Sequence, residues 1–207
     1  MVAGDRLMVI GSKNNNIFYR GACNAHMHII DPLYLKKNIA LQKIGTIAQW
    51  KVISKQLGLE RAVFVQAKPF CHDNTCIIDA IKSFGKDNSV GIGVVKKDVT
   101  QNEIINLDDN GIKGVRFSIW NPNNAVTSCE DIPVIAEKIK SFGWHIQLHM
   151  SVEQIIKNFN KLKNLNLNLV IDHMGRIGSC KALTGEGFKV ICRLIDKGNT
   201  WIKLSGA

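Results

Sequence analysis

Short apolar runs alternate with longer amphipathic segments along most of the chain. The runs, such as residues 62–66, are rich in Val, Ile and Leu, as strands buried on both faces are. The segments between them repeat apolar residues near helical spacing, and several end at a glycine such as Gly58 or Gly143. The predicted strands are 22–28, 62–66, 90–95, 112–117, 145–149, 167–173 and 200–205, and the predicted helices are 41–57, 75–84, 101–109, 131–142, 152–162 and 186–197.

This alternation predicts an α/β fold, built either as a (β/α)8 barrel or as a doubly wound open sheet. Polar residues with functional chemistry follow several predicted strands at their carboxyl ends, which converge on one mouth only in a barrel. No glycine-rich phosphate loop follows the first strand. We therefore predict a (β/α)8 TIM barrel over residues 21–207 with about seven of its eight strands, preceded by an extension or hairpin at residues 1–20.

Composition narrows the function classes further. The 207 residues carry a net charge of +10, but the lysines are spread singly, so we expect no nucleic-acid partner. No long uncharged apolar run is present, so we expect no membrane association. The first residues lack the order of a signal peptide, and the six cysteines form no Cys-x-x-Cys pair, which together favour a cytoplasmic protein with free thiols.

Histidines stand out among the candidate functional residues. His26 and His28 are one residue apart at the end of the first predicted strand, so both project to one side, where they can bind a metal, polarise a carbonyl or move a proton. His149 and His173 end two further strands. Four histidines at three strand ends indicate a site more strongly than any one of them.

Each remaining candidate has a structural alternative. Gln66 is either a substrate contact or a hydrogen-bonding residue at the barrel end, and His149 is either a substrate contact or a buried, satisfied histidine. Arg116 suits a substrate carboxylate, but it can instead pair with Asp172. We expect the tryptophans Trp120 and Trp144 to be packing residues.

Several of these stretches together resemble the amidohydrolase superfamily, in particular its branch of pyrone-dicarboxylate lactonases and sugar-lactone hydrolases. The similarity runs in order through nearly the whole chain from residue 21 onward. The matching stretches are 21–28, 60–66, 73–74, 79–80, 114–117, 144–149, 170–176 and 203–207.

The resemblance implies a barrel hydrolase that opens a lactone of a small carboxylate-bearing substrate. It implies that His26, His28 and His173 engage the substrate carbonyl and that Arg116 and Arg176 hold substrate carboxylates. This branch works without a metal, so no cofactor is expected. In other branches histidines hold zinc or another divalent metal, and here the alternative ligand set is His26, His28, His149 and His173.

Three other functions stay open at this point. The first is a metal-dependent amidohydrolase or decarboxylase of the same fold. The second is an inactive, truncated barrel, because the resemblance places the general-base aspartate on an eighth strand that we do not find in the sequence. The third and weaker one is a nuclease. The sequence names neither the lactone nor the oligomeric state.

Overall fold

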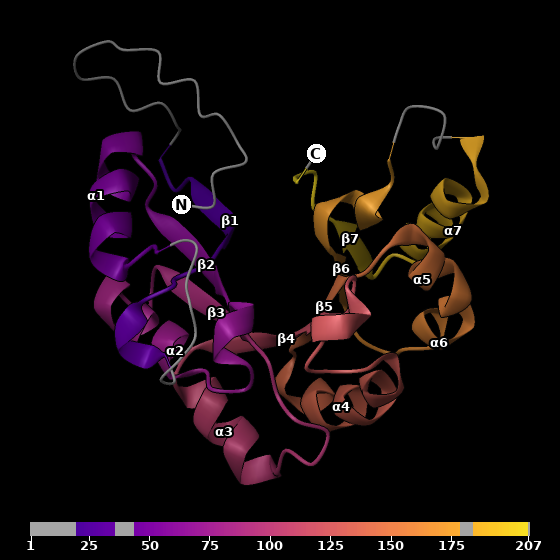
Figure 1. Cartoon of the computed structure of the whole chain (residues 1–207), viewed down its shortest axis with the longest axis horizontal. Coiled ribbons are helices and arrows are strands. Elements are labelled where there is room, and N and C mark those ends of the chain that lie inside the picture. Colours follow the sequence, from indigo (N-terminus) through magenta and orange to yellow (C-terminus); the bar gives the residue numbers. More distant parts are fainter. Residues whose placement is uncertain (1–19, 36–43, 179–183, 207) are drawn as a thin grey trace. The chain divides into compact units, whose positions relative to one another are not determined.

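The computed structural model describes residues 20–35, 44–178 and 184–206 (Figure 1). The predicted hairpin at 1–20 lies almost wholly outside the described residues. The strands are β1 (Cys23–Met27), β2 (Arg61–Val65), β3 (Ser89–Gly93), β4 (Ile112–Ser118), β5 (His145–His149), β6 (Leu169–Ile171) and β7 (Thr200–Ile202). The α-helices are α1 (Ile47–Leu57), α2 (Thr75–Phe84), α3 (Gln101–Asp109), α4 (Ile132–Ile139), α5 (Val152–Lys157), α6 (Phe159–Lys163) and α7 (Glu186–Ile195).

The strand order is the order along the chain, from β1 to β7. Neighbouring strands pair in parallel, and helices connect them, which is the topology of a (β/α)8 barrel with seven strands among the described residues. The predicted fold class is therefore confirmed. Contacts divide the chain into two compact units, the first comprising residues 1–93 and 107–112 and the second residues 94–106 and 113–207.

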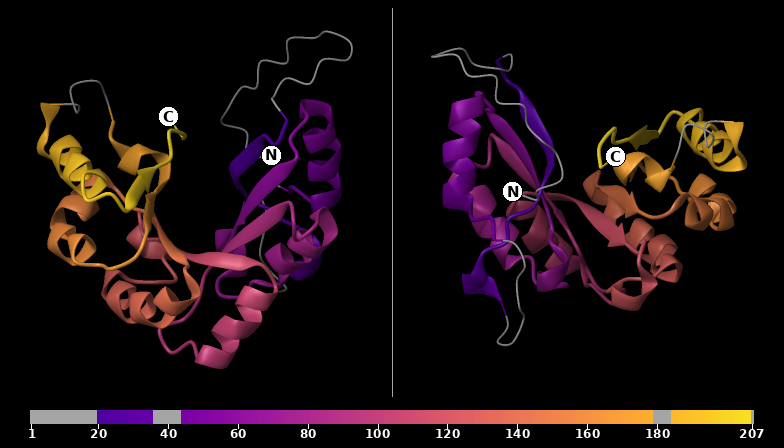
Figure 2. Two further views of the ribbon diagram at one scale, coloured as in Figure 1. Left: turned by 180° about the vertical axis from the view of Figure 1, so that it is seen from behind. Right: turned by 45° about the horizontal axis from the view of Figure 1, so that its top comes forward.

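In the first unit, α1 and α2 lie on one side of β1–β3 (Figures 1 and 2). Helix α1 begins at a capping box in which the side chains and backbone N–H groups of Thr46 and Gln49 bond reciprocally. Helix α2 packs on β2 and β3, burying Ile77 and Ile81 completely. Gly91 of β3 permits this close approach, because a Cβ there would lie 2.9 Å from Cδ1 of Ile81.

In the second unit, helices α5, α6 and α7 pack together, and α7 also packs against β7. Helix α4 turns a wholly buried face of isoleucines, Ile132, Ile135 and Ile139, toward the interior. On β5 the side chains of Gln147 and His149 are also buried, although both are polar. Buried polar side chains require hydrogen-bond partners, so other polar groups must lie close to β5. This strand is therefore a candidate part of a functional site.

Several predicted boundaries are wrong, each for a local reason. Gly45 forms a β-bridge with Ile30, so α1 starts only after Thr46, and residues 41–43 of the predicted helix lie outside the described residues. The helix predicted at 152–162 is two helices, since Asn158 bonds back to the carbonyl of Gln154 at the break. Strands β6 and β7 end at 171 and 202, earlier than predicted.

No helix in the described part of the chain has both the length and the apolar character needed to cross a membrane. Five cysteines are free thiols, as predicted, and the sixth, Cys180, lies outside the described residues.

Candidate active site

The first unit carries the histidine pair. The rings of His26 and His28 meet edge to face with centroids 5.1 Å apart, which confirms that both side chains project to one side. Nδ1 of His28 lies 2.8 Å from the carbonyl oxygen of Val65. A carbonyl only accepts, so Nδ1 carries the proton, and in the neutral ring Nε2 is the acceptor.

Gln66 follows β2 and is almost fully buried. Its Nε2 donates to the backbone carbonyls of Cys71 (3.3 Å) and Asp73 (2.6 Å), so its amide group holds the loop before α2. The predicted structural alternative is thus confirmed for the donor end of the side chain. The acceptor, Oε1, is buried and has no hydrogen-bond partner among the described residues.

In the second unit the turn after β6 has an unusual backbone. Four consecutive residues are left-handed, with φ of 52° at His173, 54° at Met174, 61° at Gly175 and 55° at Arg176. A left-handed conformation costs roughly 1–2 kcal/mol per non-glycine residue, so the surroundings must hold the turn in place. The N–H of Met174 donates to the carbonyl of Lys203 at 3.0 Å, which ties the turn to the end of β7.

Asp172 begins this turn, and its side chain is wholly buried. It accepts from Nε of Arg116 at 3.0 Å and from Nε2 of Gln147 at 3.1 Å. Nζ of Lys203 donates to Oε1 of Gln147 at 2.9 Å and lies 3.8 Å from the other Asp172 oxygen. The ion pair of Arg116 with Asp172, which was the predicted alternative for this arginine, is confirmed.

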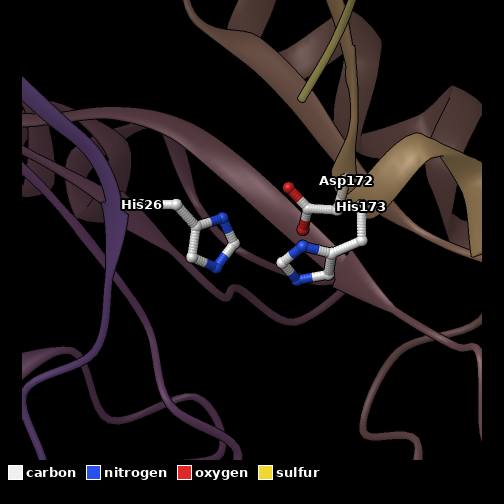
Figure 3. Close-up of side chains that lie close together, drawn as sticks. All are labelled: His26, Asp172 and His173. Carbon is white, nitrogen blue, oxygen red and sulfur yellow. The ribbon is translucent and has the colours of Figure 1, made fainter. Parts of the chain in front are cut away.

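His173 leaves the turn next to Asp172 (Figure 3, which also draws His26 on β1). Nδ1 of His173 lies 3.0 Å from the hydroxyl oxygen of Ser205. Gly206 sits against the ring, because a Cβ there would come within 2.7 Å of Nδ1. The segment after β7 therefore fixes the orientation of this imidazole.

Arg176, at the other end of the turn, contacts two aromatic rings. Its guanidinium lies 4.7 Å from the ring centre of Trp120 and hydrogen-bonds Nε2 of His149 through Nη2 at 3.1 Å. Nδ1 of His149 lies 2.9 Å from the hydroxyl oxygen of Ser118. The prediction of a packing role is confirmed for Trp144, which is 1% exposed. Trp120 is 46% exposed, and its ring packs against the guanidinium of Arg176.

Burial and charge set the protonation of the buried groups. Burial and the guanidinium of Arg116 lower the pKa of His149 to about 3. Burial and the Lys203 ammonium lower the pKa of His145, at the start of β5, to about 4. Burial also lowers the pKa of Arg116, while Asp172 opposes this shift. Both histidines are neutral at physiological pH.

The four-histidine zinc set fits this arrangement poorly. A histidine ligates a metal through a ring nitrogen lone pair. His149 has only one, on Nε2, and this atom accepts from Arg176, while Nδ1 is bonded to Ser118. Zinc at His149 would therefore require displacing Arg176.

The structure thus places the predicted residues in two groups. His26, His28 and Gln66 belong to the first unit, and the second unit brings together Arg116, His149, His173 and Arg176. Sequence reasoning missed the supporting residues Gln147, Lys203, Ser118 and Ser205. A signal existed for two of them: Gln147 and Lys203 are polar residues inside apolar strand runs, where a partner is required.

Comparison with known proteins gives a consistent picture. The family model described as Amidohydrolase matches residues 24–207. A curated relative, 2-pyrone-4,6-dicarboxylate hydrolase of Comamonas testosteroni, is 29% identical over 89% of this chain. The chain spans only 62% of that relative's length.

Two solved structures share the fold. A probable 2-pyrone-4,6-dicarboxylic acid hydrolase from Acinetobacter baumannii with citric acid bound is 22% identical, with a TM-score of 0.73 over 90% of this chain and 70% of that one. An amidohydrolase from Burkholderia multivorans with bound zinc is 12% identical, with a TM-score of 0.65 over 89% and 69%. Metal is therefore present in some proteins of this fold.

Proposed function

Because the chain belongs to the amidohydrolase family, we propose that it opens the lactone ring of a small carboxylate-bearing substrate by hydrolysis. The observation that carries the proposal is the turn at residues 172–176, which presents an imidazole and a guanidinium from one short segment. An imidazole can stabilise the oxyanion that forms from an ester carbonyl, and a guanidinium binds a carboxylate through two parallel bonds. The Comamonas testosteroni relative, a dicarboxylate hydrolase by name, supports this substrate class.

We assign His173, His26 and His28 to the substrate carbonyl. Ser205 and Gly206 fix the ring of His173, so it can meet the developing charge without reorganising. His28 donates from Nδ1 to Val65, so its Nε2 accepts a proton when the ring is neutral and donates when the ring is protonated. It can therefore move a proton during ring opening.

The carboxylate of the substrate is assigned to Arg176, which is partly exposed. Arg116 is committed to Asp172 and buried, so we propose that it acts on the substrate by supporting the turn that carries His173. For Gln66 only Oε1 remains to contact a substrate, since Nε2 is bonded to the loop backbone.

Hydrolysis of 2-pyrone-4,6-dicarboxylate and of aldarolactones, measured with a chelator present, tests the proposal. We expect the replacement His173→Asn to lower kcat/KM by about a hundredfold or more, as loss of a group acting in proton transfer or charge stabilisation does. Lys189→Gln, an exposed change on α7, is the matched control and should leave the rate unchanged. Equal rates for His173→Asn and the unchanged protein would refute the assignment.

A metal-dependent amidohydrolase or decarboxylase is the second candidate, favoured by the zinc in the Burkholderia multivorans structure. If His149 is one of the metal ligands, this candidate also requires Arg176 to leave His149. Elemental analysis of protein purified without chelator separates the two candidates: stoichiometric zinc or manganese would support the second, and its absence the first. We further propose a cytoplasmic location, in keeping with free thiols.

A further inference from the structure

Arg176 has two partners within the protein, His149 and Trp120. Both Nε, at 3.3 Å, and Nη2, at 3.1 Å, lie within hydrogen-bond distance of the same atom, Nε2 of His149. The indole of Trp120 covers one face of the guanidinium, and its own ring lies 5.8 Å from that of His149. One edge and one face of the guanidinium are therefore already occupied by the protein.

The hydrogen bonds decide which nitrogen of His149 carries the proton. A guanidinium has donors and no acceptor, so Nε2 must present a lone pair to Arg176. The ring is neutral, hence its proton is on Nδ1 and is donated to Oγ of Ser118. His149 is 8% exposed, and each of its ring nitrogens has a partner within the protein.

We infer that His149 is a positioning residue, which does not touch the substrate but presents Arg176 to it. This inference rests on the proposed function. With Nε and Nη2 turned to His149 and one face stacked on Trp120, the edge between Nη1 and Nη2 remains for a ligand. That edge matches a carboxylate held by two parallel hydrogen bonds in the guanidinium plane.

The backbone of the turn also helps to orient the Arg176 side chain. Arg176 is left-handed, and the preceding Gly175 is packed so closely that a Cβ would lie 2.8 Å from Cδ1 of Ile191 and 3.0 Å from Cδ1 of Ile155. The direction of the Arg176 side chain is thus set by the backbone turn and by its two aromatic neighbours before any ligand arrives. Preorganisation of this kind removes part of the ordering cost of binding.

The tautomer of His149 is tested directly by nitrogen-15 NMR of the histidine side chains in the unchanged protein. We expect His149 to carry its proton on Nδ1 at every pH between about 5 and 8, in keeping with its burial. A proton on Nε2, or a doubly protonated ring in that range, would overturn the inference. This result does not depend on catalytic activity, so it stands apart from the test of the proposed function.

The positioning role is tested by calorimetric titration with citrate, a carboxylate probe, on two variants. His149→Gln keeps an acceptor for Arg176 and should bind citrate within about threefold of the unchanged protein, whereas His149→Leu removes the acceptor and should bind about tenfold more weakly. Equal citrate binding by His149→Leu and the unchanged protein would overturn the positioning role. Binding by His149→Gln as weak as that by His149→Leu would also overturn it, because the imidazole itself would then contact the ligand. If the unchanged protein binds no carboxylate, the proposed function fails, while the NMR result still decides the tautomer.

Discussion

Replacing Asp172 by Asn should destabilise the protein strongly. The side chain of Arg116 is 5% exposed and that of Asp172 is 0% exposed, with 3.0 Å between Nε and Oδ2. Asp172→Asn keeps the shape and an acceptor for Gln147, but it leaves the Arg116 charge buried without its counter-ion. Breaking a buried pair in this way costs about 3–5 kcal/mol.

The double variant isolates the cause. Arg116→Met alone should lower the free energy of unfolding by less, about 1–3 kcal/mol. In this variant Asp172 still accepts a hydrogen bond from Gln147 and still lies near the Lys203 ammonium. Arg116→Met combined with Asp172→Asn removes both charges of the pair, and the nearby Lys203 ammonium keeps its hydrogen bond to Gln147. The double variant should therefore be at least ~2 kcal/mol more stable than Asp172→Asn alone.

The assay is urea unfolding of the four proteins, followed by circular dichroism. Lys140→Gln serves as the control, since Lys140 pairs with Glu137 on the surface and its loss should change stability by less than about 0.5 kcal/mol. A loss of stability below ~1 kcal/mol for Asp172→Asn would show that the buried Arg116 does not depend on its counter-ion. So would a double variant whose loss equals the sum of the two single losses.

Three further outcomes are expected. The pKa of His149 is lowered from 6.5 to about 3, so the unfolded chain binds more protons than the folded one between these values. Stability should therefore fall as pH drops below about 6.5, and His149→Gln should flatten this slope in acid titrations followed by fluorescence. Gly175→Ala should cost about 1–3 kcal/mol in thermal unfolding, because alanine is strained at φ 61° and meets Ile191 and Ile155. Trp120→Ala should weaken citrate binding measured by calorimetry severalfold while changing stability by less than ~1 kcal/mol, since the indole is half exposed and stacks on Arg176; unchanged affinity would exclude Trp120 from the site.

The features of the fold that depend on the spacing of apolar residues could be predicted from the sequence. Parallel strands buried on both faces give continuous apolar runs, so the order of strands and helices and the fold class could be predicted. Side-chain alternation was enough to place His26 and His28 on one side. Charge complementarity suggested the pairing of Arg116 with Asp172, which the structure confirms.

The rest depended on tertiary contacts that have no local signature. The left-handed turn at 173–176 contains only one glycine, so no residue pattern indicated that the strand ends before His173. The contact of Trp120 with Arg176 joins residues that are far apart in the sequence, so no local pattern indicated it. Lys203 joins the site through Gln147, a contact that only the folded chain reveals.

The most direct test of the central proposal is the rate of ring opening of 2-pyrone-4,6-dicarboxylate by the purified protein, measured with and without a chelator. We predict turnover that the chelator leaves unchanged and that Arg176→Leu weakens mainly through a higher KM. Absence of turnover with this and every aldarolactone tried, or turnover that the chelator abolishes, would contradict it.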